Sequence, residues 1–272
     1  MTTTPGQDKR IELKYSIDES LAQAVREWAC EHLGVDPHCC ETLIDSYDVN
    51  TLYLDSPELD LYHRTGVVGS TKHRIRRYGQ EEMLWLECKR KKQDVVRKSR
   101  TAVPESEVLE RLPLEPRGAE DVWCGEWFAE RVAKRKLIPT VQVHYRRFAR
   151  MATLDNQSLR LTIDSQLQAS RITGWHDSLI ASRSSDACRV DISPAHILEL
   201  KFHNHTPVLF KQLLCQFALP TSSFSKYRTA VGACELVAAA PLPSVAHYSD
   251  STRTAATIVD CPATDEERLT HA

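Results

Sequence analysis

The sequence lacks any apolar run close to the roughly 20 residues that a membrane-spanning helix needs. Its first ten residues, MTTTPGQDKR, are polar and lack the apolar core of a secretory signal. We therefore expect a cytoplasmic protein with no membrane span of its own.

Cysteine is present, but not in a pattern that indicates a metal centre. The nine cysteines form no CxxC pair, and the adjacent His38, Cys39 and Cys40 have no second cluster to complete a zinc site. An odd number of cysteines without a secretory signal is typical of reduced thiols.

Aromatic residues are few, and net charge is almost absent. The formal net charge is −2, so the charge of the whole chain indicates neither nucleic acid nor membrane as a partner. Aromatic residues make up 7% of the chain, whereas proteins that bind single-stranded nucleic acids interleave aromatic rings with basic residues. We expect no nucleic-acid partner.

Basic charge is instead concentrated in one stretch of this nearly neutral chain. The eleven basic residues from Lys72 to Arg100 outnumber the four acidic ones, Glu81, Glu82, Glu87 and Asp94, by seven. Such a stretch indicates either a polyanionic ligand or an ordinary solvated basic surface.

Periodicity predicts one large domain over residues 9–237, between a flexible N-terminus (1–8) and a disordered, acidic C-terminal tail (238–272). Amphipathic helices are expected at 18–33, with Asp18 as N-cap, at 119–136, and at 205–219, with Pro207 in the first turn. The proline- and glycine-containing segment 105–118 is expected to be mainly a connection.

Seven other segments alternate charged and apolar residues with the period of a β-strand. They are 10–15, 72–78, 84–91, 96–103, 141–149, 158–164 and 197–202. Their charged faces pair basic with acidic residues at a spacing of two, as in Glu12 and Lys14 or Glu199 and Lys201. An antiparallel sheet with one wet face would explain this pattern. A closed sheet with charges inside and helices outside would also explain it, and its interior would be a water-filled tunnel.

Nine short motifs occur along the chain in the order found in one known family. They are E12-L-K14-Y15, Y53-L-D55-S56, R74-I-R76-R77-Y78-G79, E87-C-K89, K98-S-R100, Y145-R-R147-F148, R160-L-T-I-D164, E199-L-K201-F202 and S225-K226-Y227. Over roughly residues 10–230 the chain thereby resembles the VTC domain family of the CYTH-like triphosphate tunnel superfamily. The resemblance implies an α+β fold with an antiparallel, eight-stranded β-tunnel, closed around a charged interior and flanked by helices. It also implies an ATP-dependent polyphosphate polymerase that uses Mn²⁺ or Mg²⁺.

The resemblance also implies roles for individual residues. The catalytic phosphate ligands would be Lys14, Arg74, Arg76, Lys89, Lys98, Arg147, Arg160 and Lys226. Further substrate contacts would come from Arg100, Lys91, Lys201, Tyr145 and Tyr227. Glu199 would hold the metal, with Glu12 or Glu87 as additional ligands. The three glutamates are alternatively structural partners of the basic residues beside them. We expect Asp164 to be a structural partner, and His73 and His144 to face away from the charged side.

One departure from the superfamily pattern separates the alternatives. Hydrolytic tunnel enzymes carry an ExExK motif on the first strand, whereas this chain has Arg10 at the first acidic position. The departure favours a polymerase, with ATP and polyphosphate as partners, over a tunnel triphosphatase. A non-catalytic polyphosphate-binding module is a further alternative. A separate membrane partner for the polymer stays open, and we expect a monomer.

Overall fold

A computed structural model describes residues 10–37, 39, 45–66, 68–69, 71–92, 95–112, 123–154, 156–175, 189–193 and 195–237. Its strands are β1 (Arg10–Ile17), β2 (Gly34–Val35), β3 (Ser46–Asp55), β4 (Thr71–Tyr78), β5 (Met83–Lys92), β6 (Val95–Pro104), β7 (Ile138–Leu154), β8 (Gln157–Arg171), β9 (Val190–Ser193) and β10 (His196–His203). Its helices are α1 (Glu19–His32), α2 (Asp60–His63), α3 (Glu105–Arg111), α4 (Glu126–Lys134), α6 (Val208–Gln216) and α7 (Lys226–Ala233). The expected flexible N-terminus and acidic tail lie outside the described residues.

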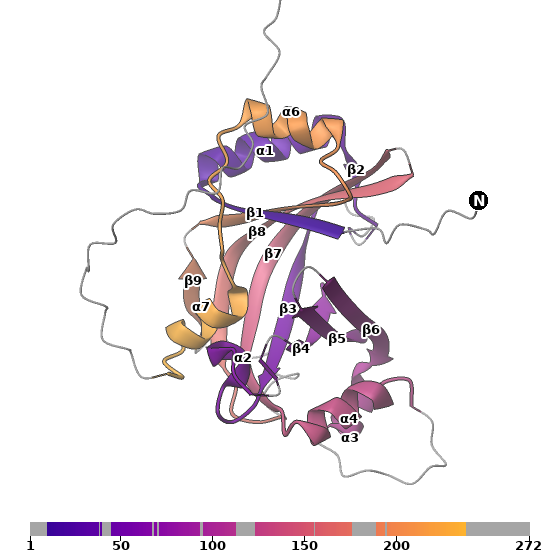
Figure 1. Ribbon diagram of the computed structural model, residues 1–272, viewed down its shortest axis with the longest axis vertical. Coiled ribbons are helices and arrows are strands. Elements are labelled where there is room, and N and C mark those ends of the chain that lie inside the picture. The colour runs from indigo at the N-terminus through magenta and orange to yellow at the C-terminus, as the bar shows by residue number, and fades with distance from the viewer. Residues whose placement is uncertain are drawn as a thin grey trace, which may run out of the picture.

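All described strand pairs are antiparallel, and eight of the ten strands form one continuous path. The order along it is β1-β10-β8-β7-β3-β4-β5-β6, with β2 beside β7 and β9 beside β8. The sheet curves strongly, so that β1 crosses one end while β4, β5 and β6 stand opposite (Figure 1). The α+β architecture is therefore confirmed.

The expected closure into an eight-stranded barrel was wrong. The path ends at β1 and at β6, and no backbone pairing joins these two strands within the described part of the chain. Paired strands must lie about 4.8 Å apart. Here a salt bridge spans the gap instead, because Lys89 of β5, the strand next to β6, pairs with Glu12 of β1 at 3.2 Å.

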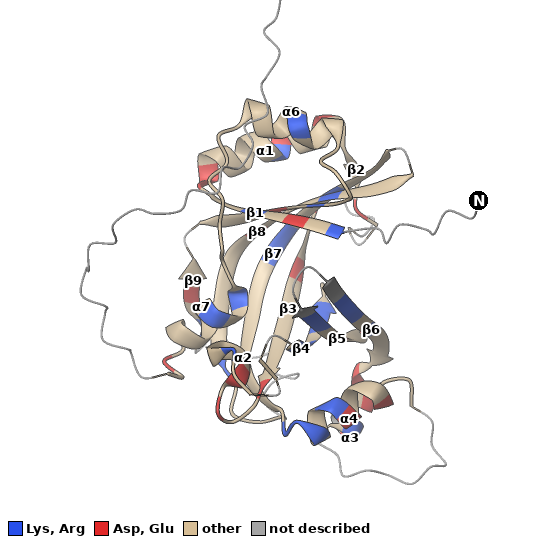
Figure 2. Cartoon of the chain, in the orientation of Figure 1, with Lys and Arg blue, Asp and Glu red and all other residues tan. Residues whose placement is uncertain are grey.

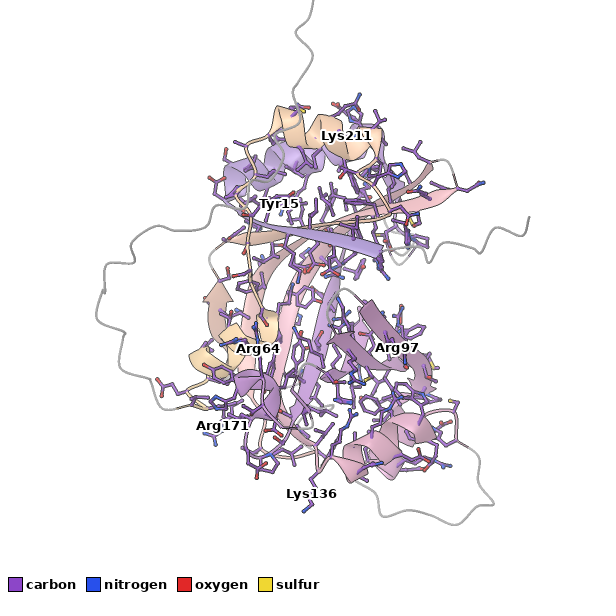
Figure 3. All side chains as sticks on the ribbon, viewed as in Figure 1. Tyr15, Arg64, Arg97, Lys136, Arg171 and Lys211 are labelled. Carbon is purple, nitrogen blue, oxygen red and sulfur yellow. The ribbon has the colours of Figure 1, made fainter. Side chains whose placement is uncertain are left out.

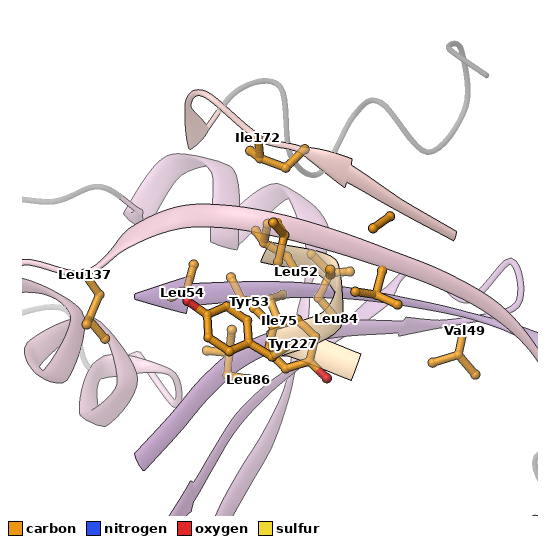
Figure 4. Packing of buried hydrophobic residues seen from close by; sticks show 14 of the residues in the cluster. Val49, Leu52, Tyr53, Leu54, Ile75, Leu84, Leu86, Leu137, Ile172 and Tyr227 are labelled. Atoms are coloured by element: carbon orange, nitrogen blue, oxygen red, sulfur yellow. The ribbon is translucent and has the colours of Figure 1, made fainter. Parts of the chain in front are cut away.

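Helices α1 and α6 cover part of the outer, apolar face of the sheet, as expected. Asp18 caps α1 by accepting a hydrogen bond from the backbone N–H of Leu21 at 2.8 Å. Helices α1 and α6 bury the apolar side chains of β1, β8 and β10, among them Leu161, Leu198 and Leu200. The larger apolar cluster lies around β3, β4, β5 and β7, and Figure 4 shows part of it.

Three local expectations are revised by the structure. Helix α6 begins after Pro207 and is shorter than the predicted 205–219. Helix α4 covers the second half of the predicted segment 119–136, whose first residues lie outside the described ranges. The segment expected to be a connection begins with helix α3, because Val108 and Leu112 are buried in the large apolar cluster and order this stretch.

Candidate functional site

The charged residues predicted to share strand faces do meet on one face of the sheet, which we call the inner face. The strand register aligns Lys14 with Glu199, and Glu12 with Lys201. It also aligns Arg74 with Glu87, and Lys89 with Lys98. Blue and red segments accordingly follow the strands that enclose the interior (Figure 2), and side chains fill the space between them (Figure 3).

Strands β4, β5 and β6 form the first side of this interior, which we call the basic wall. Its inner-face residues are Lys72, Arg74, Arg76, Glu87, Lys89, Lys98 and Arg100. The Glu87 carboxylate is completely buried and contacts four of these cations. The distances are 2.6 Å to Arg74, 3.6 Å to Arg76, 3.1 Å to Lys98 and 3.2 Å to Arg100.

Electrostatics on the basic wall favour an additional anion. Burial would raise the pKa of Glu87, but Arg74, Arg76 and Lys98 hold that pKa well below its usual range. One carboxylate cannot neutralise all its neighbours. Burial, together with repulsion from Arg74 and Arg100, therefore lowers the pKa of Lys98 despite its contact with Glu87. The wall stores repulsion that a bound polyanion would relieve.

The second side, which we call the mixed wall, consists of β1, β10, β8, β7 and the first residue of α7. Arg147 of β7 donates two hydrogen bonds, of 2.6 and 2.8 Å, to the carboxylate of Asp164 of β8. Lys226 of α7 reaches the same carboxylate at 2.6 Å. Burial opposes ionisation of Asp164, yet the two cations lower its pKa to about 2. Asp164 is thus a structural partner, as the sequence indicated.

Two further carboxylates stand on the mixed wall. Glu199 contacts Lys201 at 2.6 Å and Lys14 at 3.3 Å. Lys14 also lies 3.4 Å from Glu12, and therefore bridges the two glutamates. Burial and the charge of Glu199 oppose ionisation of Glu12, but Lys201, Lys89 and Lys14 lower its pKa to about 2. Burial also opposes ionisation of Glu199, but Lys201 and Lys14 hold its pKa well below its usual range, so both glutamates are ionised at neutral pH.

One end of the inner face opens into a pocket of about 340 Å³, which we call the mouth. Its lining includes Arg10, Asp36, Ser158, Arg160, Lys201 and His203. Arg160 is held in place by the buried Asp36 at 2.7 Å and by the hydroxyl of Tyr47 at 2.9 Å. Arg10 and Lys201 add positive charge, so this pocket suits an anionic ligand.

The carboxylates differ in how well they suit a divalent metal. Within the described ranges, no three His, Cys, Asp or Glu side chains lie close enough together to form a metal site by themselves. Glu87 is surrounded by four cations and therefore fits poorly. Glu12 and Glu199 together contact three cations, Lys14, Lys89 and Lys201, so fewer cations surround each carboxylate than at Glu87. They therefore fit better an ion that takes one or two protein carboxylates and completes its shell with phosphate oxygens.

Most residues predicted for the site lie together on the inner face. Three of the predicted substrate contacts differ, because one side chain is not described and two are buried. The side chain of Lys91 lies outside the described part of the chain. Tyr145 is buried beneath Arg147 and Lys226, whose charged groups lie 5.3 and 4.8 Å from its ring centre. Tyr227 lies in the core, where its hydroxyl donates to Asp55.

Sequence reasoning assigned no role to three uncharged residues that contact the site's arginines. Thr51 of β3 accepts a hydrogen bond from Arg76 at 3.1 Å, and Tyr78 accepts another at 3.2 Å. Trp85 stacks on Arg100, whose guanidinium lies 3.5 Å from a ring centre. The alternation in β3 and the aromatic residues within the basic segment were available signals. A search that considers only charged residues does not detect these three side chains.

Solved structures of other proteins show a distant similarity to this chain. A solved structure of a proposed adenylate cyclase from Bacillus halodurans is similar over 80% of this chain and 95% of that one, with 13% identity and a TM-score of 0.45. A proposed adenylyl cyclase from Hippeastrum, described as having a dominant triphosphatase activity, is similar over 82% of this chain and 95% of that one, with 12% identity and a TM-score of 0.45.

No curated protein matches the chain. None of the described helices combines the length and the apolar character required to cross a membrane. The VTC domain matches residues 9–234, which is most of the sequence. The chain therefore belongs to the VTC domain family.

Proposed function

We propose that this protein is a polyphosphate polymerase that transfers the γ-phosphate of ATP to the end of a growing polyphosphate chain. The observation that supports this most is the inner face itself, where cations outnumber carboxylates on both walls and each carboxylate fixes the cations around it. Membership of the VTC family points to the same class of reaction.

The chain's own residues supply position and charge. Phosphoryl transfer has a loose transition state with charge spread over the transferred oxygens, so that catalysis consists mostly of alignment and electrostatic stabilisation. Arg74, Arg76 and Arg147 are held by buried carboxylates or hydroxyls and present planar groups that bind two phosphate oxygens at once. Lys14, Lys89 and Lys98 add compact charge around the same interior.

The acceptor needs little activation. The terminal phosphate of a chain is already ionised at neutral pH, so no strong general base is required. Glu199 and Glu12 would hold a Mn²⁺ or Mg²⁺ ion, which would neutralise charge on phosphate oxygens and orient them. Arg10, at the first acidic position of the hydrolytic motif, supports synthesis over hydrolysis. In this proposal the polymer leaves through the mouth beside Arg10.

The test is incubation of purified protein with ATP and Mn²⁺, followed by a gel stained for polyphosphate and an assay for ADP. We expect long polymer and ADP from the unaltered protein, and neither from Lys89→Ala or Arg74→Ala. Arg97→Ala is the matched control, because Arg97 is exposed and alternates with Lys98, on the outer face of β6 (Figure 3).

The other outcomes each identify an alternative. Free phosphate or pyrophosphate without polymer would mean a tunnel triphosphatase. Retained polyphosphate binding without turnover would mean a binding module. Either result would refute the proposed polymerase.

A further inference from the structure

Lys226 differs from the other described cations of the inner face because a helix, rather than a strand, presents it. It is the first residue of α7, which Ser225 caps by accepting a hydrogen bond from the backbone N–H of Arg228. Its ammonium lies 2.6 Å from Asp164 and 4.8 Å from the ring centre of Tyr145. The position of this charge therefore depends on how α7 is fixed to the sheet.

The next residue, Tyr227, provides that attachment. Its hydroxyl donates to Asp55, a fully buried carboxylate at the end of β3. Asp55 also accepts backbone N–H groups from Ser56 and Leu61, each at 2.8 Å, and from Tyr62 at 3.2 Å. A single carboxylate thus joins β3, α2 and α7. Burial and the neighbouring carboxylate raise the pKa of Tyr227, which keeps the phenol protonated and donating.

Helix geometry connects this attachment to the charge. Consecutive helical residues point about 100° apart, so Tyr227 can enter the core while Lys226 enters the interior. Figure 4 shows Tyr227 beside Tyr53 and Leu54 in the apolar cluster, and the rings of Tyr227 and Tyr53 lie 5.3 Å apart. Fixing Tyr227 therefore fixes the rotation of α7 about its axis, and with it the place of the Lys226 ammonium.

We propose that Asp55 and Tyr227 are positioning residues that hold Lys226 against Asp164 as a phosphate ligand. The inference rests on the proposed function, since it takes a phosphate chain to be the ligand. Arg147 keeps its two bonds to Asp164 without help from α7, so loss of the attachment removes one ligand and leaves the rest of the mixed wall intact.

A double-mutant cycle tests this coupling. The four proteins are the unaltered chain, Tyr227→Phe, Lys226→Ala and the double variant, and the readout is affinity for inorganic triphosphate by calorimetry. Tyr227→Phe keeps the ring, so the core stays filled. We expect Lys226→Ala to weaken binding about 10-fold, the loss of one charge-assisted contact, and Tyr227→Phe to weaken it several-fold. In the Lys226→Ala background, Tyr227→Phe should cost less than about 2-fold.

Two control variants separate an effect on the position of Lys226 from an effect on the stability of the fold. Tyr15→Phe removes a hydroxyl from a buried tyrosine on the helix-covered side of the sheet (Figure 3), and it should leave triphosphate affinity unchanged. Asp55→Asn should repeat the effect of Tyr227→Phe, again only when Lys226 is present. Unfolding midpoints in urea show how much stability each change costs.

The proposal is overturned if Tyr227→Phe weakens binding equally with and without Lys226. It is also overturned if Tyr227→Phe lowers the unfolding midpoint without changing affinity. If the expected coupling is found in a protein that makes no polymer, the positioning role stands and the polymerase function fails. A chain that binds no triphosphate at all would refute both.

Discussion

The two walls of the interior use the same strand geometry to hold very different charge. The basic wall presents six cations, Lys72, Arg74, Arg76, Lys89, Lys98 and Arg100, to one carboxylate, Glu87. The mixed wall sets three carboxylates, Glu12, Asp164 and Glu199, among Lys14, Arg147, Arg160, Lys201 and Lys226. The basic wall is therefore suited to bare phosphate oxygens, and the mixed wall to phosphates that arrive with a metal ion.

The difference between the walls also explains how the protein tolerates so many buried cations when no ligand is bound. Repulsion among buried cations would destabilise the sheet if each stood alone. On the mixed wall, ion pairs largely cancel that repulsion. On the basic wall, a single buried carboxylate does so for four neighbours, and the remaining excess is available to attract a polyanion.

Replacement of Glu87 should have the largest effect. Glu87→Gln keeps the shape of the side chain but leaves four cations without their counter-charge, so the free energy of unfolding should fall by about 3–5 kcal/mol. Urea unfolding measures the loss, and added triphosphate should restore part of it, since a ligand of the folded state stabilises that state. Glu130→Gln, at an exposed position on α4, is the matched control. Equal stability of Glu87→Gln and the unaltered protein would contradict this account.

Acid should act on the outer and inner faces of the sheet in different pH ranges. His73 lies on the outer face of β4, where burial and Arg135 lower its pKa to about 4. The unfolded chain therefore takes up this proton first, and stability should be lost as the pH falls from about 6.5 to 4. Glu12 and Asp164 have folded pKa values of about 2, so their contribution is lost only below about pH 4.5.

Urea unfolding at a series of pH values separates these ranges. Between pH 6.5 and 4 the unaltered protein should lose about 3 kcal/mol. His73→Gln still offers an acceptor to Arg135 but does not titrate, so its stability should stay nearly constant over this range. Glu12→Gln should change the curve only at lower pH. A His73→Gln curve parallel to that of the unaltered protein would exclude the assigned role.

Metal binding should distinguish the walls directly. Glu199→Gln should weaken Mn²⁺ binding in the presence of inorganic triphosphate by at least about 10-fold, because the loss of groups that order a metal site commonly costs that much. Glu12→Gln should cost less, since Glu12 is more exposed than Glu199. Electron paramagnetic resonance of free Mn²⁺ measures this without turnover. A larger effect of Glu87→Gln than of Glu199→Gln would reverse the assignment of the walls.

Period-two alternation was sufficient to predict the strands with charged inner faces, and it placed Glu12, Lys14, Arg74 and Glu87 on that face. It failed for β3, the strand at the centre of the path. There the inner positions are the residues Tyr47, Val49, Thr51 and Tyr53, none of which is Lys, Arg, Asp or Glu. Thr51 nevertheless orients Arg76, and Tyr47 orients Arg160. The alternation of charged and apolar residues therefore could not reveal uncharged residues that orient the arginines.

Closure and the role of α7 needed three-dimensional information. Whether the ends of the path pair depends on the curvature of the whole sheet and on side chains such as Lys89 and Glu12, which meet from distant parts of the chain. Lys226 was expected at the site because of the motif S225-K226-Y227. Consecutive residues of a helix point in different directions, however, so Lys226 and its neighbour Tyr227 do not both face the interior. Tyr227 was predicted to contact substrate, whereas the structure places it in the core with Asp55. Its role in binding stays a prediction, now through Lys226.

The smallest effect is expected at the mouth. Arg10 is exposed there, and a single exposed charge is largely screened by salt, so Arg10→Ala should weaken polyphosphate binding by about 2-fold at low salt and not measurably at 0.5 M salt. Lys89→Ala, within the interior, should keep a larger effect at both salt concentrations. Arg97→Ala, on the outer face, is the control for loss of one positive charge. A salt-resistant loss in Arg10→Ala as large as that in Lys89→Ala would mean that the mouth, and not the basic wall, contributes the main attraction for the polyanion.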